Sequence, residues 1–369
     1  MTTMVFHAPY PVVENGTGSA ARPPRLLRAF RELGIEVLDV TGHGAERARK
    51  LRALRRRLRA GQRIDFAYGE SSTMPTVLTE PHHLPTHPLV DLELLRLLRA
   101  HGVPTGLFYR DVYWRFPAYD LSVPRLVGLG TKTLYHAELQ VMGRWLDRLY
   151  LPSAQMAAYV PHVDAAITRA LPPGGVLTDL AAAHGRRPDE PLRIFYVGNV
   201  SDYYRMHALF AGAARVDGVE LTVCVPPEAW EAVRSEYEPL IADGPGRVRV
   251  VHGRGAELEP YFAAADLCAL VVEPAEYRDF AAPIKLFEYI GHGLPVLASA
   301  GTHAADLVTS EGMGWSVDYD ADAVAARLVA LRDDPAEVER VRDAVRRGRE
   351  HHSWEARARQ VAEDLSALR

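Results

Sequence analysis

Strand-like runs alternate with helical patterns along the 369-residue chain, and this alternation limits the possible folds more than any other feature. In the first half, "MVFHA", "IEVLDV", "RIDFAYGE", "PTGLFYRD" and "RLYLPS" are separated by stretches with apolar residues at helical spacing. Such a succession is typical of parallel strands joined by crossover helices. Runs such as "GLFY" are apolar without alternation, as in a sheet covered on both faces. The sequence therefore predicts an α/β fold.

A break in this pattern at residues 171–191 divides the chain. This stretch is rich in proline, glycine and charge, and a second succession of strands and helices begins at "RIFYVGN". We expect an N-terminal Rossmann-like domain over residues 1–180, a second one over 190–350, and a final helix over 351–369. Two doubly wound domains imply a cleft, because open parallel sheets bind ligands outside the carboxyl ends of their strands.

Composition narrows the class of protein. A hydrophobic content of 48% with 24% charged residues is ordinary for a globular chain, and a formal net charge of −4 gives no global case for nucleic-acid binding. Cys224 and Cys268 lie in apolar runs, which predicts reduced core thiols and a cytoplasmic protein. We expect no signal peptide, and no apolar run is long enough to span a bilayer.

The stretch "PIKLFEYIGHGLPV", residues 283–296, predicts a short helix starting at Pro283 and followed by a buried strand. Helical spacing places Lys285, with Glu288 or Tyr289, on the side opposite the apolar stripe. An exposed Lys–Glu pair would be worth only a few tenths of a kcal/mol. Alternatively, the helix N-terminus and Lys285 suit a diphosphate, and Glu288 suits ribose hydroxyls. The position of this helix after a strand and a long loop favours ligand binding over a surface ion pair.

The same stretch resembles the nucleotide-sugar-binding segment of GT-B glycosyltransferases, especially bacterial family 4-like enzymes of the group 1 type. The resemblance extends to "ADLCALVVEP", to the strand end "FYVGN" and to "HSWEARARQVAEDL", and covers most of residues 192–369. It implies two doubly wound Rossmann-like domains facing a cleft. The second would hold the nucleotide sugar and the first the acceptor, and the last helix would return to the first domain.

Carried over to this sequence, the resemblance implies that Lys285 contacts the diphosphate and Glu288 the ribose. Tyr289, Gly198 and Asn199 are further candidate donor-binding residues. Many retaining members carry a second glutamate eight residues before the ribose-binding one, where this chain has Phe280. This departure leaves the stereochemical outcome open.

Glycines after the first predicted strand form a further candidate donor contact. In "ENGTGSAARPP", Gly16 and Gly18 would let a diphosphate approach the backbone closely. An ordinary glycine turn before a helix explains the same letters.

In the first half, "YGESST" and "GLFYRDVYWRFP" each follow a predicted strand. Asp111, beside Arg110, is the candidate base for an acceptor hydroxyl, and Glu70 is the rival base or an acceptor contact. Arg110, Tyr113 and Trp114 are candidate acceptor-binding residues, because aromatic rings stack on sugars. A structural Arg–Asp pair with packed aromatic rings is the alternative.

Two further segments could be read either as functional sites or as ordinary structural features. "DYDAD" at 318–322 resembles the acidic metal-binding triplet of the other glycosyltransferase fold, but helix capping explains it better. The basic helix at 46–63 has Leu51, Leu54 and Leu58 on one side. We interpret its basic side as solvated, with contact to an anionic bilayer as the alternative.

The sequence thus predicts a metal-independent glycosyltransferase without a cofactor other than its nucleotide diphosphate sugar donor. The acceptor would be a glycan, a lipid-linked glycan or a small molecule. Two other functions remain open: an epimerase or hydrolase acting on nucleotide sugars, and a non-catalytic GT-B partner subunit.

Overall fold

The computed structural model describes residues 2–13, 18–178, 186–201, 204–242 and 244–369. The chain forms two compact units. The first comprises Met1–Pro173 together with Trp354–Arg369, and the second comprises Gly174–Ser353. The division at Pro173 lies within the break that the sequence pattern shows at residues 171–191 and before residue 180, the expected end of the first domain.

In the first unit a parallel sheet is built from six strands in the order β2-β1-β3-β4-β5-β6. The strands are β1 (Thr3–Ala8), β2 (Glu36–Thr41), β3 (Phe66–Glu70), β4 (Thr105–Phe108), β5 (Arg148–Leu151) and β6 (Thr168–Ala170). The α-helices are α1 (Arg22–Glu32), α2 (Gly44–Arg59), α3 (Val90–Ala100), α4 (Pro117–Ser122), α5 (Arg125–Trp145) and α13 (Trp354–Ser366). Short 3-10 helices are η1 (Gly18–Ala21), η2 (Thr76–Leu78), η3 (Tyr113–Arg115), η4 (Gln155–Tyr159) and η5 (Ala165–Ile167).

The second unit repeats this architecture with the sheet order β12-β11-β10-β7-β8-β9. Its strands are β7 (Leu192–Val197), β8 (Val219–Cys224), β9 (Arg247–Val251), β10 (Leu267–Leu270), β11 (Val296–Ser299) and β12 (Gly314–Val317). Its α-helices are α6 (His207–Ala214), α7 (Pro227–Ile241), α8 (Glu259–Ala264), α9 (Ile284–Gly291), α10 (His303–Ser310), α11 (Ala321–Asp333) and α12 (Pro335–Gly348). Its 3-10 helices are η6 (Gly255–Leu258), η7 (Glu276–Asp279) and η8 (Arg349–His352).

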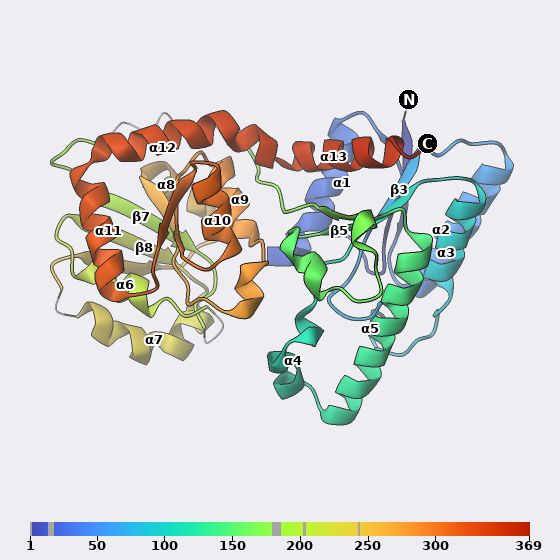
Figure 1. The fold of residues 1–369 in the computed structure, drawn as a ribbon, viewed down its shortest axis with the longest axis horizontal. Coiled ribbons are helices and arrows are strands. Elements are labelled where there is room, and N and C mark those ends of the chain that lie inside the picture. Colours follow the sequence, from blue (N-terminus) through green and yellow to red (C-terminus); the bar gives the residue numbers. More distant parts are fainter. Residues whose placement is uncertain (1, 14–17, 179–185, 202–203, 243) are drawn as a thin grey trace. The chain divides into compact units, whose positions relative to one another are not determined.

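Helices cover both faces of each sheet. In the first unit α1 and α13 lie on one face and α2, α3 and α5 on the other (Figure 1). In the second unit α6 and α7 cover one face, and α8, α9 and α10 the other (Figure 1). Right-handed crossovers require this change of face where the strand order reverses. Strands β1, β3, β4 and β10 are buried throughout, which explains why their sequences do not alternate.

The final helix, α13, belongs to the first unit although the whole second unit precedes it in the chain. Its buried residues Trp354, Ala358, Val361 and Leu365 form one helical stripe, which packs against α1, β3 and β4.

The structure confirms two predictions from the sequence, one about the cysteines and one about a helix cap. Cys224 and Cys268 are free thiols buried in the second unit. Asp320 in "DYDAD" is the N-cap of α11, because its carboxylate accepts the backbone N–H groups of Asp322 and Ala323. Among the helices that the structure describes, none is both long and apolar enough to cross a membrane.

Candidate functional site

The strand order of the second sheet reverses between β7 and β10, which are neighbours although two strands separate them in the chain. Doubly wound sheets bind their ligands at the carboxyl ends of the strands beside such a switch point. The loop that begins with Gly198 follows β7, and α9 follows β10 through η7. Apart from Gly16 and Gly18, the residues that the sequence proposes for donor binding come from these two segments.

Lys285, in the first turn of α9, is held by aromatic side chains at this switch point. Its Nζ donates a hydrogen bond to the Tyr196 hydroxyl at 2.6 Å and lies 4.5 Å from the ring centres of both Tyr196 and Tyr204. The Tyr196 hydroxyl in turn donates to the Asn199 carbonyl at 2.6 Å. Cation–π contacts and a hydroxyl acceptor stabilise the ammonium without neutralising its charge.

Gly198 makes room for this lysine. An ideal Cβ at Gly198 would overlap the side-chain end of Lys285. The backbone there has φ +146°, a conformation that residues with side chains rarely adopt. Glycine at the end of β7 and lysine at the start of α9 are therefore parts of one arrangement, 87 positions apart in the sequence.

Burial lowers the pKa of Lys285 from its ordinary value of 10.5 to about 7, and the nearby Glu288 carboxylate opposes this shift. A bound anion would stabilise the ammonium form of such a lysine and raise its pKa, because a negative charge within a few ångströms favours the protonated form. The position is suited to a phosphate group.

The other candidate donor-binding residues of the second unit differ in how exposed their side chains are. Glu288 is half-buried on α9 and Asn199 is exposed after β7. The structure places Tyr289 in the core: its side chain is fully buried and its hydroxyl accepts the backbone N–H of Val197 at 3.1 Å, which argues against a donor contact. Helical spacing alone could not separate Glu288 from Tyr289. Phe280, at the position of the missing second glutamate, is buried against Tyr277.

In the first unit, Glu70 at the end of β3 is fully buried in a charged network. Its Oε1 accepts the Nε–H of Arg22 at 3.0 Å and the hydroxyl of Tyr68 at 2.7 Å. Arg22 also donates to the carbonyl of Pro172 at 3.2 Å and stacks on Phe108. The Glu70 carboxylate is therefore not accessible in this structure, and a buried arginine occupies it, which argues against a role as base or acceptor contact.

Arg110 is also anchored. Its Nη2 donates to the Tyr10 hydroxyl at 2.7 Å and lies 3.6 Å from Oε2 of Glu70, while its backbone N–H donates to Ser71 Oγ at 3.0 Å. The structure thus brings loops after β1, β3 and β4 together at the carboxyl edge of the first sheet. Arg110 remains a candidate acceptor contact only through the part of its guanidinium that these bonds leave accessible.

Asp111 is half-buried directly beside this edge, and its Oδ1 accepts the backbone N–H of Tyr113 at 2.7 Å. Tyr113 is half-buried, with its ring edge-to-face against Tyr119. The side chain of Trp114 is buried and stacked on Tyr135 at 4.9 Å, and its Nε1–H donates to the Tyr109 hydroxyl at 3.0 Å, which argues against an acceptor contact.

The glycine pair of the first loop is only partly within the described residues. Gly16 lies outside them, and Gly18 is the first residue of η1. Within the described ranges, no group of three or more His, Cys, Asp or Glu side chains is arranged to hold a metal ion.

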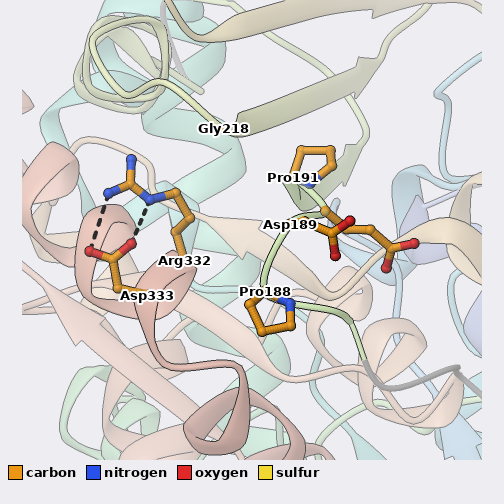
Figure 2. Close-up of a pocket in the computed structure, with 7 residues that line it drawn as sticks. Pro188, Asp189, Pro191, Gly218, Arg332 and Asp333 are labelled. Atoms are coloured by element: carbon orange, nitrogen blue, oxygen red, sulfur yellow. Dashed lines mark hydrogen bonds and ion pairs between the residues drawn. The ribbon is translucent and has the colours of Figure 1, made fainter.

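A pocket of about 470 Å³ in the second unit is lined by Pro188, Asp189, Glu190, Pro191, Gly218, Arg332 and Asp333. Figure 2 shows Arg332 turned onto Asp333, with hydrogen bonds of 2.7 and 3.2 Å. Pro191 and Gly218 immediately precede β7 and β8. The pocket therefore lies at the amino ends of the strands, opposite the edge at which doubly wound sheets bind their ligands.

Sequence analysis missed several residues that shape both edges. Tyr196 and Tyr204 flank Lys285, and Tyr10 and Arg22 hold Arg110 and Glu70. One signal was available: Arg22 is a charged residue just before "PP" in α1, at a position that the helix buries.

Comparison with known proteins relates the chain to glycosyltransferases in fold and in part of its sequence. Residues 191–334 match the family model of group 1 glycosyl transferases. The chain is similar in structure to sucrose-phosphate synthase from Thermosynechococcus elongatus, with a TM-score of 0.64 and 18% identity over 100% of this chain and 99% of that one. HepE of Anabaena, in complex with UDP and glucose, gives 0.62 and 13% over 99% of both chains.

A third solved structure is WaaG, a glycosyltransferase involved in lipopolysaccharide biosynthesis, with a TM-score of 0.55 and 16% identity over 99% of both chains. No curated protein sequence matches the chain. At these identities the solved structures establish the fold alone, and the family model matches less than half of the chain. The chain therefore has the GT-B fold, and its residues 191–334 match the model of group 1 glycosyl transferases.

Proposed function

We propose that this chain transfers a sugar from a nucleoside diphosphate sugar to an acceptor hydroxyl, with the donor bound at the switch point of the second unit. The observation that carries the proposal is Lys285. Its ammonium lies at the start of α9 and over Gly198, with two aromatic rings and a hydroxyl as partners. A helix N-terminus adds backbone N–H groups and a positive partial charge to the same place.

In this mechanism the second unit binds the leaving nucleoside diphosphate. The Lys285 ammonium and the first turn of α9 stabilise the negative charge that develops as the glycosidic bond to the diphosphate breaks. The anomeric carbon passes through an oxocarbenium-like state. These groups can supply the required charge without a metal, and we propose a metal-independent transfer for that reason.

UDP is the donor nucleotide to test first, because HepE, with the same fold, was solved with UDP and with UDP-glucose. Titration calorimetry with UDP, GDP, dTDP and ADP tests the donor site directly. Binding of one nucleotide supports the proposal, and absence of binding for all four contradicts it. Product analysis then separates the reactions: free sugar or an epimer formed without acceptor indicates a hydrolase or an epimerase.

On the acceptor side we propose Asp111 as the base, with Tyr113 and Arg110 as acceptor contacts. Asp111 is half-buried at the carboxyl edge of the first sheet and close to the Arg110 cation in the chain. A glycan, a lipid-linked glycan or a small molecule would each offer a hydroxyl to such a base. The two buried free thiols favour a reducing compartment such as the cytoplasm.

The affinity for UDP is expected to fall as the pH rises above 7. Binding needs the protonated form of Lys285, and with a pKa of about 7 in the free protein that form becomes scarce at higher pH. The loss should approach about tenfold per pH unit, until the pKa of the complex is reached. Calorimetry from pH 7 to 9 measures it. Lys285→Met should bind UDP more weakly and without this slope. An equal slope in wild type and variant would show that another group titrates.

Glu288→Ala is expected to weaken the binding of both UDP and uridine by at least about tenfold, because hydrogen bonds to a carboxylate contribute roughly 1.5–3 kcal/mol. Lys285→Met should leave uridine affinity unchanged, since uridine carries no phosphate. Glu228→Ala, an exposed carboxylate on α7, is the matched control. Unchanged uridine affinity in Glu288→Ala would exclude the ribose contact.

A further inference from the structure

Large apolar side chains are exposed together at the junction of α4 and α5 in the first unit. Leu121 is 89% exposed, Leu126 87%, Leu129 69% and Val127 54%. We name residues 115–132 the α4–α5 tip. Figure 1 shows α4 and the first turns of α5 at the end of α5 that lies away from β5. Leucines exposed to this degree are normal when scattered singly, but four apolar residues within nine positions form a patch that needs an explanation.

The geometry of the tip favours insertion over enclosure. Leu126 and Leu129 are three residues apart on α5 and share one side of the helix, while Leu121 is the next-to-last residue of α4. Because the leucines are so exposed, they stand out from the surface and do not line a hollow. Such side chains can enter a soft apolar phase, whereas a small ligand needs concave walls.

The charge of the tip indicates which kind of apolar phase it could enter. The tip carries Arg115, Arg125 and Lys132 against a single carboxylate, Asp120, which is paired with Lys132 at 2.6 Å. The whole chain has a formal net charge of −4, so this positive apolar segment stands apart from the rest. Exposed leucines beside exposed arginines are the combination by which peripheral proteins bind anionic lipid surfaces.

We propose that the α4–α5 tip inserts into the surface of an anionic lipid bilayer. The proposal concerns membrane binding and is independent of the transfer reaction. It differs from the bilayer contact that the sequence leaves as an alternative for the basic helix α2, whose leucines Leu51, Leu54 and Leu58 are buried in the unit. Within α2, all of which is described, no large apolar side chain is among the exposed ones, so α2 can offer charge but no insertion.

Sedimentation with vesicles of phosphatidylcholine, with and without phosphatidylglycerol, tests the proposal on the full chain. Wild type is expected to sediment with the anionic vesicles. The double variant Leu126→Gln, Leu129→Gln should reduce the affinity for these vesicles by at least about tenfold. The reason is that burying one leucine side chain in an apolar phase stabilises binding by about that factor or more. Leu84→Gln is the matched control, because Leu84 is 61% exposed outside the tip. Arg52→Glu with Arg56→Glu tests α2.

Several results would overturn the proposal: no binding of wild type, an equal loss in Leu84→Gln, or a loss confined to the α2 variant. A tip variant that changes the molar mass by light scattering while leaving vesicle binding unchanged would instead make the patch a contact between two copies of the chain. Unchanged melting temperatures show that the variants are folded, which exposed positions should allow. Because the assay contains no nucleotide, its outcome does not depend on the donor-site proposal.

Discussion

Glu70→Ala is expected to lower the free energy of unfolding of the first unit by about 3–5 kcal/mol, the usual cost of removing one partner of a buried ion pair. The substitution leaves the Arg22 guanidinium buried and without the carboxylate 3.0 Å away. It also removes the acceptor of the Tyr68 hydroxyl and the opposite charge nearest to Arg110. Few single substitutions in this unit disturb so many buried polar groups.

Differential scanning calorimetry measures this effect. The transition of the first unit should shift to lower temperature while that of the second stays in place, and the second unit thus serves as an internal control. Arg22→Met combined with Glu70→Leu removes both charges and should recover most of the loss, because an apolar pair of similar volume replaces the ion pair. A Glu70→Ala protein with unchanged stability but no turnover would restore Glu70 as a candidate base.

The alternating pattern was sufficient to predict the α/β fold, because most strands are apolar runs and most connections between them contain an α-helix. The edge of each sheet that carries the site could be predicted for the same reason. Lys285 could be proposed as a donor contact from the sequence because it is a cation in the first turn of a helix that follows a strand. These features depend on residues close together in the sequence.

What the sequence could not predict depends on contacts between distant segments. Glu70 looks like an accessible carboxylate after a strand until Arg22, from α1, occupies it. Trp114 looks like a sugar platform until Tyr135 of α5 stacks on it. Tyr289 and Glu288 are neighbours in the sequence, and only the packing of α9 against β7 shows that Tyr289 is in the core. Packing decides which polar or aromatic side chains remain available.

Asp111→Asn is expected to reduce turnover by at least roughly a hundredfold, the usual contribution of a positioned base, with little change in stability. The structure makes this a sharp test. Asp111 Oδ1 accepts the backbone N–H of Tyr113, and the amide oxygen of asparagine can accept the same bond. The turn at η3 should therefore persist, while the side chain loses its ability to take a proton at neutral pH.

Asp111→Ala provides the comparison, because it removes both the base and the turn hydrogen bond. If Asp111 is the base, the two variants should have similar turnover, and only alanine should lower the melting temperature. If Asp111 serves only the turn, asparagine should keep both turnover and stability, and alanine should lose stability. UDP affinity, measured on the same preparations, should be unchanged in either variant, since Lys285 and Glu288 belong to the second unit. Near-wild-type turnover in a stable Asp111→Asn protein would remove Asp111 from the mechanism, and because Glu70 is buried against Arg22, the base would then have to come from another residue or from the acceptor itself.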